Sequence, residues 1–175
     1  MKIVHTPRDL FFDQLRDIYS MEVQISQSMP HLVALCANES LRQLIERHAH
    51  QNCFQIAQIS EIFERHGESP GDDTCKAIAG LIEGGTCNLR KVKDPHTRDL
   101  MMIAHCLRIE HYEMAAYDIT TMLAGRLGMI NEPELLSQLL EEEKDMAAAL
   151  LQWEPVFFEI ADGTGVDPKV RPLRG

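Results

Sequence analysis

Four long stretches of this chain repeat apolar residues with the period of an α-helix, and Gly, Pro and Asn breakers separate them. The stretches cover about residues 7–37, 38–66, 95–128 and 131–160. The sequence shows no alternating strand pattern, no internal repeat and no low-complexity segment. Helices of this length bury their apolar faces only by packing on one another, so the chain is predicted to be all-α.

The ends of these stretches carry helix-capping signals. Thr6 and Pro7 predict a cap and a first-turn proline, and Asn38 can cap the second helix. Gly67 is placed to end that second helix. Pro30 lies inside the first stretch, where it predicts a kink.

The connections between the helices indicate the architecture. The first pair and the last pair of helices are joined by short loops, whereas a long segment links the two pairs. Within it, residues 72–91 predict one short helix despite the glycines at positions 80, 84 and 85. This scheme is typical of ferritin-like proteins. We therefore predict an all-α, ferritin-like up-down four-helix bundle over residues 1–162, with a short extra helix in the long crossover and a C-terminal tail over residues 163–175.

Charge and composition exclude several classes of function. The net charge is −10, and the only basic concentration is Arg90, Lys91, Lys93 and Arg98, so we expect no nucleic-acid partner. No apolar run approaches the length of about 18–20 residues that spans a bilayer. The N-terminus does not resemble a signal peptide, so we expect a cytoplasmic protein that does not enter a membrane. Five cysteines without a CxxC pair argue against a disulfide framework and a zinc ribbon.

Glutamates interrupt the apolar stripes of three helices near their middles. They are Glu22 on the first, Glu110 and Glu113 on the third, and Glu143 on the fourth. A buried ionised carboxylate is costly unless it is paired or bound to a metal. Four at one level of a bundle therefore predict a shared cation site. The alternative is that Glu22 and Glu143 reach solvent or pair with arginine, and that Glu113 supports a ligand without binding the ion.

On the second helix, the residues expected at this level are His50 and Cys53. Their i, i+3 spacing places them on neighbouring parts of one helix face. The predicted metal ligands are therefore Glu22, His50, Cys53, Glu110, Glu113 and Glu143. Core packing is the alternative role for Cys53. The remaining histidines considered, His48, His66, His96 and His111, are expected on the surface or in hydrogen bonds.

Four segments together resemble the YciE/YciF group of bacterial ferritin-like stress proteins. They are Leu15 to Glu22, Ala79 to Gly85, Ile109 to Tyr117 and Leu140 to Lys144, within a resemblance that spans about residues 8–155. Glu110-His111-Tyr112-Glu113 is the most specific of these matches.

The resemblance implies a ferritin-like fold, a homodimer and a dinuclear centre of iron or manganese. It carries Glu22, Glu110 and Glu143 over as ligands, with Glu113 as their companion. On the second helix the family has Glu-x-x-His where this chain has His50-Gln51-Asn52-Cys53. The loss of a carboxylate and the gain of a thiol favour zinc or another borderline metal, or no metal at all.

Two functions follow as hypotheses. With an intact centre, we expect iron or peroxide redox chemistry on a small-molecule oxidant, with Tyr19 or Tyr112 as nearby hydroxyls. With a degenerate or single-metal, zinc-like site, we expect a non-enzymatic dimeric stress or scaffold protein. Whether the chain is an enzyme stays open at this point. A phosphotransfer role for His105 is disfavoured, because Ile109 stands where that motif has glycine.

Overall fold

The structure, a computed structural model, describes residues 3–165 of the 175-residue chain. Those residues contain five α-helices and no strand. The helices are α1 (Pro7–Leu35), α2 (Glu39–His66), α3 (Lys76–Lys91), α4 (Pro95–Arg126) and α5 (Glu132–Ala161). The all-α prediction is therefore confirmed. The predicted tail begins at residue 163, and from residue 166 onward it lies outside the described residues.

The helix ends follow from local chemistry. Thr6 and Asp9 form a capping box at the start of α1, and the Asn38 side chain accepts hydrogen bonds from the first turn of α2. Gly67 ends α2 with a φ of 64°, in the left-handed region that favours glycine. These caps were predicted from the sequence. The helix α1 continues through Pro30 to Leu35.

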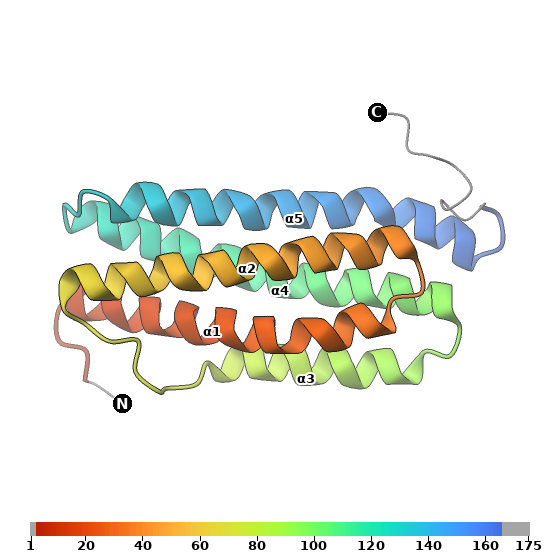
Figure 1. The fold of residues 1–175 in the computed structure, drawn as a ribbon, viewed down its shortest axis with the longest axis horizontal. Coiled ribbons are helices and arrows are strands. Elements are labelled where there is room, and N and C mark those ends of the chain that lie inside the picture. Colours follow the sequence, from red (N-terminus) through yellow and green to blue (C-terminus); the bar gives the residue numbers. More distant parts are fainter. Residues whose placement is uncertain (1–2, 166–175) are drawn as a thin grey trace.

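The helices α1, α2, α4 and α5 form the bundle, and their order around it fixes which side chains meet. Figure 1 shows that α1 and α5 run in one direction and that α2 and α4 run in the other. Both α1 and α5 pack against α2 and α4, so each neighbouring pair is antiparallel. Each of the four helices therefore presents a seam to the same core.

The long connection between α2 and α4 contains α3, as predicted. This helix lies outside the bundle against α1 and α4 (Figure 1). A Cβ atom at Gly85 would stand 1.9 Å from Nδ1 of the buried His105 on α4. Glycine is therefore required where α3 approaches α4 most closely.

The buried residues of each bundle helix recur with alternating spacings of four and three. In α1 the buried residues at this spacing are Phe11, Leu15, Ile18, Glu22, Ile25, Met29 and Leu32, with Phe12 and Met21 buried beside them. In α2 the buried residues at this spacing are Leu41, Ile45, His48, Asn52, Gln55, Ile59 and Ile62, with Leu44 and Phe63 buried beside them. This spacing is that of helices packed at small crossing angles. The ends of both seams are apolar, and polar side chains occupy their middles.

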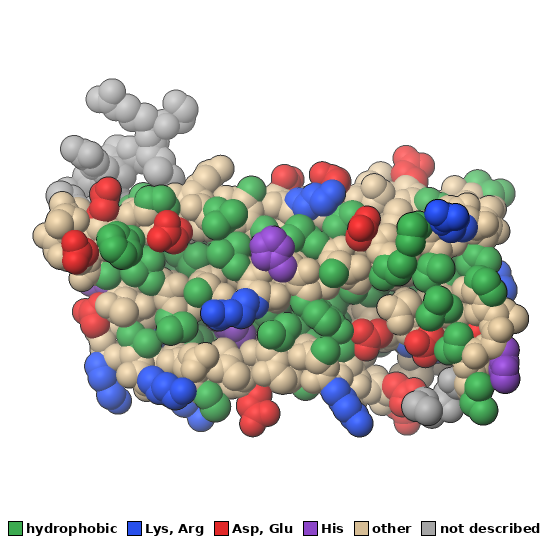
Figure 2. Space-filling view, turned by 180° about the vertical axis from the view of Figure 1, so that it is seen from behind, with side chains coloured by type: hydrophobic (Ala, Val, Ile, Leu, Met, Phe, Trp, Pro, Cys, Tyr) green, Lys and Arg blue, Asp and Glu red, His purple; other side chains and the backbone are tan. Residues whose placement is uncertain are grey.

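The surface of the bundle mixes charge types. Figure 2 shows acidic, basic and hydrophobic side chains interspersed on the face that it displays, with basic side chains along the edge where α3 lies. Large exposed hydrophobic side chains include Phe54, Ile130 and Phe158. Within the described residues, no helix is long and apolar enough to cross a membrane.

Candidate metal centre

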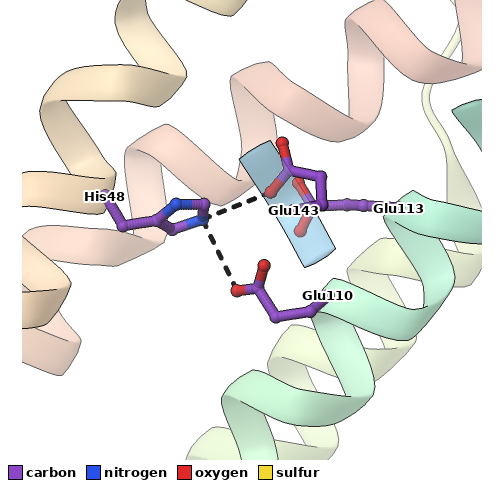
Figure 3. Close-up of side chains that lie close together, drawn as sticks. All are labelled: His48, Glu110, Glu113 and Glu143. Carbon is purple, nitrogen blue, oxygen red and sulfur yellow. Dashed lines mark ion pairs between the residues drawn. The ribbon is translucent and has the colours of Figure 1, made fainter. Parts of the chain in front are cut away.

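Polar side chains from all four bundle helices meet in the middle of the core. Four of them, His48 on α2, Glu110 and Glu113 on α4, and Glu143 on α5, each offer one ligand atom within 4.8 Å of all the others. Figure 3 shows the three carboxylates converging on one space, with the imidazole of His48 pointing at them. The Nε2 atom of His48 lies 3.5 Å from Oε1 of Glu110 and 3.9 Å from Oε2 of Glu143.

These four residues lie on the buried seams, which is why they converge. His48 is 2% exposed, Glu110 is 1% exposed, and Glu113 and Glu143 are fully buried. Because α2, α4 and α5 lie side by side and have similar lengths, residues near the middle of each helix reach the same level of the bundle. We refer to these four residues as the central cluster.

Several ligand atoms of the central cluster have no hydrogen-bond partner within the described residues. They are Nε2 of His48, Oε2 of Glu110, both carboxylate oxygens of Glu113, and Oε2 of Glu143. Buried polar atoms without partners are rare in folded proteins, because each one loses its interaction with water. Lone pairs directed into a common buried space need a cation, protons or ordered water.

Burial shifts the protonation of every member of the central cluster. It raises the pKa of Glu110 and of Glu113 well above the usual range, and the negative charge of Glu143 raises both pKa values further. Burial raises the pKa of Glu143 to about 7, while hydrogen bonds from Glu110 and Gln55 act in the opposite direction. Burial also lowers the pKa of His48 to about 4, so the imidazole is neutral at physiological pH.

Glu22 on α1 lies beside the central cluster but is bound differently. Its Oε1 accepts a hydrogen bond from the Tyr117 hydroxyl at 2.5 Å, and its Oε2 accepts one from the amide nitrogen of Asn52. All three side chains are fully buried. Burial, followed by the charge of Glu143, raises the pKa of Glu22 well above its usual value.

Gln55 on α2 belongs to the same buried layer of polar side chains as the central cluster, Glu22, Asn52 and Tyr117. Its amide nitrogen donates to Oε1 of Glu143 at 2.6 Å and to Oε2 of Glu142 at 2.9 Å. Asn52 and Gln55 are three residues apart and both fully buried, so α2 directs two amides and one imidazole at the carboxylates.

The α2 residues predicted from the sequence lie elsewhere. His50 and Cys53 are both exposed, and the Cys53 thiol lies 4.0 Å from the Ser26 hydroxyl. The structure brings Glu110, Glu113 and Glu143 together, places Glu22 next to them, and leaves His50 and Cys53 on the outside of α2.

His48, which was expected on the surface or in a hydrogen bond, is 2% exposed and is the α2 member of the central cluster. The missed signal is the alternating four and three spacing from Leu41 to Ile62, which passes through 48, 52 and 55 and not through 50 or 53. Polar residues at three successive seam positions concealed it. The tyrosine of the polar layer is Tyr117, whereas Tyr112 donates to Asp17 and Tyr19 packs on Phe63.

The residues of the central cluster fit a divalent cation. Two ligand atoms on opposite sides of an ion bound at about 2.1 Å are about 4.2 Å apart, close to the observed spread of up to 4.8 Å. Carboxylate and imidazole ligands suit manganese, iron and zinc. The unpartnered lone pairs of Glu113 are the observation that favours a cation here.

Comparison with known proteins places the chain among relatives of similar length. It is 33% identical over 140 residues to Protein YciF of Escherichia coli strain K12, an alignment that covers 79% of this chain and 84% of that protein. The crystal structure of the Escherichia coli stress protein YciF matches with a TM-score of 0.85 and 30% identity, covering 89% of this chain and 99% of the other.

Two further solved structures share the fold. YcfI of Rhodopseudomonas palustris, described as a proposed structural protein, matches with a TM-score of 0.82 and 30% identity over 85% of this chain and 95% of its own. A protein of Xanthomonas campestris matches with a TM-score of 0.73 at 17% identity, over 90% of this chain and 98% of its own, which shows the fold alone.

The family model described as a domain of unknown function, DUF892, matches residues 6–157. The resemblance to the YciE/YciF group that the sequence motifs indicated is confirmed by these matches. The chain therefore belongs to the DUF892 family.

Proposed function

We propose that this protein is a ferritin-like, stress-associated metal-binding protein whose four-helix core holds a divalent ion. The single observation that carries the proposal is the central cluster, in which four buried ligands from three helices converge and five of their ligand atoms have no hydrogen-bond partner in the described chain. The relation to the stress protein YciF supports the association with stress. His48, Glu110, Glu113 and Glu143 would hold the ion.

When it is iron or manganese, the bound ion would supply one-electron chemistry towards peroxide or oxygen. The surrounding chain would exclude bulk water, because the members of the central cluster are at most 2% exposed. Neutral His48 would bind through Nε2, its atom nearest the carboxylates. Tyr117 and Asn52 would keep the Glu22 carboxylate fixed beside the ion.

A matched pair of variants on α2 tests the metal proposal. Titration of chelator-treated protein with Mn²⁺, Fe²⁺ or Zn²⁺ should give saturable binding in the wild type. His48→Ala removes a buried ligand, so we expect affinity to fall by more than about a hundredfold. His50→Ala removes an exposed imidazole two residues away and should leave affinity unchanged. Absence of binding in the wild type, or equal binding by both variants, would refute the proposal.

The redox part of the proposal has its own assay. Protein incubated with iron and freed of unbound iron should consume hydrogen peroxide faster than the same concentration of His48→Ala treated in the same way. A second candidate function, a non-enzymatic structural protein, is favoured by the description of YcfI as a proposed structural protein. Metal binding without peroxide consumption would favour this second function. A free energy of unfolding that chelator does not change would show that the structural protein needs no metal.

The resemblance to the YciE/YciF group also leads us to propose a homodimer. Exposed apolar side chains such as Phe54 and Phe158 provide surface that a second copy could bury. Light scattering after size exclusion should give twice the chain mass of 19.9 kDa. A mass equal to one chain would contradict this proposal.

A further inference from the structure

Among the buried polar side chains of the core, the central cluster and Glu22 differ in their hydrogen bonding. At the central cluster, five ligand atoms have no hydrogen-bond partner among the described residues. Beside the cluster and adjoining Glu113, both oxygens of Glu22 accept hydrogen bonds, one from Tyr117 and one from Asn52. The carboxylate and imidazole lone pairs without a partner therefore belong to the central cluster and not to Glu22.

A carboxylate site for two ions in a helical bundle uses one Glu from each of two helices and a Glu-x-x-His pair from each of the other two. On α2, the one pair of buried residues at that spacing in which both are polar is Asn52 and Gln55, and His48 is preceded three residues earlier by the apolar Ile45. On α5, Glu143 is followed three residues later by Met146, whose thioether is a soft ligand suited to other metals. Neither helix supplies the complete pair.

The two amides also occupy carboxylate oxygens. The Asn52 amide nitrogen donates to Oε2 of Glu22, and the Gln55 amide nitrogen donates to Oε1 of Glu143 at 2.6 Å. The Tyr117 hydroxyl donates to the other oxygen of Glu22 at 2.5 Å. These N–H and O–H donors stabilise carboxylate charge at the positions where a second cation would do so. Asn52 Oδ1 and Gln55 Oε1 have no hydrogen-bond partner in the described chain.

We infer that this core binds one divalent cation and not two, with His48, Glu110, Glu113 and Glu143 as its ligands and Glu22 held outside the ligand set by Tyr117 and Asn52. The inference rests on the proposed metal-binding function and deepens it. It departs from the dinuclear centre that the family resemblance implies. In this account Glu22 is a positioning residue that borders the ion site.

Ion stoichiometry is the first test. Chelator-treated wild-type protein is loaded with excess Mn²⁺, freed of unbound metal and measured for Mn²⁺ per chain and for its electron paramagnetic resonance spectrum. We expect one ion per chain, with the hyperfine pattern of an isolated Mn²⁺. Two ions per chain, or the spectrum of a coupled pair, would overturn this inference while supporting metal binding. No bound ion would overturn the proposed function and this inference with it.

Two isosteric variants distinguish the role of Glu113 from that of Glu22. Glu113→Gln removes a ligand with two unpartnered oxygens, so Mn²⁺ affinity should fall by more than about a hundredfold. Glu22→Gln replaces a carboxylate that already accepts two hydrogen bonds, so the protein should keep its ion with affinity lowered by no more than about a hundredfold. Loss of the ion in Glu22→Gln would show that Glu22 is a ligand and would overturn the inference.

A Glu-x-x-His pair built at the buried positions 52 and 55 should open a second ion position. The double variant Asn52→Glu, Gln55→His places Glu-x-x-His on the buried face of α2, and we expect it to bind two Mn²⁺ per chain. Gln51→Glu adds a carboxylate at an exposed neighbouring position and should stay at one. A folded double variant that still binds one ion would contradict the role given to the two amides. If that variant does not fold, the Glu22→Gln result decides the inference.

Discussion

Without a metal, the central cluster should make the protein more stable in mild acid than in mild alkali. Burial raises the pKa of Glu143 from its usual value of 4.5 to about 7, and it raises the pKa of Glu22, Glu110 and Glu113 in the same direction. A carboxyl with a raised folded-state pKa stabilises the fold fully below its unfolded pKa. That stabilisation is lost as the pH rises through the folded-state value.

The size of the effect can be worked out for Glu143. A pKa shift from 4.5 to about 7 corresponds to a change of about 3 kcal/mol in the free energy of unfolding as the pH rises past both values. Between pH 8 and pH 6.5 this one group contributes about 1 kcal/mol, and the other three carboxyls add to it. His48 acts oppositely, because its pKa is lowered to about 4, so its stabilisation is lost as the pH falls from about 6.5. Above pH 6.5 the carboxyls therefore determine that the free energy of unfolding falls as the pH rises.

The assay is urea unfolding of chelator-treated protein at pH 6.5 and pH 8. The free energy of unfolding should be higher at pH 6.5 by at least about 1 kcal/mol. Glu143→Gln, which mimics the protonated acid, should reduce this difference, whereas the exposed Glu61→Gln should not. With saturating metal the sign should reverse, because the ion competes with protons. A metal-free protein that gains stability from pH 6.5 to pH 8 would refute the reasoning.

Four further substitutions test the contact between α3 and α4 and the ends of the helices. Gly85→Ala places a Cβ 1.9 Å from His105, so urea unfolding should show a free energy of unfolding lower by about 1–3 kcal/mol. Gly84→Ala meets open space and should be neutral or stabilising by up to about 1 kcal/mol in the same assay. Equal effects of the two would contradict the close approach of α3. Asp99→Ala removes the acceptor of the Ala37 and Asn38 backbone N–H groups, at 2.9 and 2.8 Å, and should lower the thermal midpoint, costing about 2–4 kcal/mol. Asn38→Ala removes the α2 cap and should cost about 1 kcal/mol in the same assay, and no change would exclude the capping role.

The helices and their ends could be predicted because their signals are local. Thr6, Asn38 and Asp94 each accept a backbone N–H of the helix that follows, and Gly67 ends α2 in the left-handed region. The crossover was also predictable, since only a long segment between α2 and α4 can carry an extra helix. The close approach of Gly85 to His105 was not, because it depends on how α3 lies across the bundle.

The glutamates of the centre were visible because charge on an apolar stripe is conspicuous. The α2 contribution was misplaced because three successive seam positions, His48, Asn52 and Gln55, are polar, which removes the hydrophobic contrast that defines a seam. His50 and Cys53 differ from the true register by one or two residues, which is enough to turn a side chain outward on a helix. Hydrogen bonding, such as Tyr117 to Glu22, appears only in three dimensions.

The central claim is that one ion lies between His48 and the three carboxylates of the central cluster. The most direct measurement is anomalous diffraction from crystals loaded with Mn²⁺ or Zn²⁺. We predict one strong peak per chain, at about 2.0–2.2 Å from Nε2 of His48 and from oxygens of Glu110, Glu113 and Glu143. A peak bound instead by His50 or Cys53 on the outer face of α2, or no peak in the core of a metal-loaded crystal, would contradict the account.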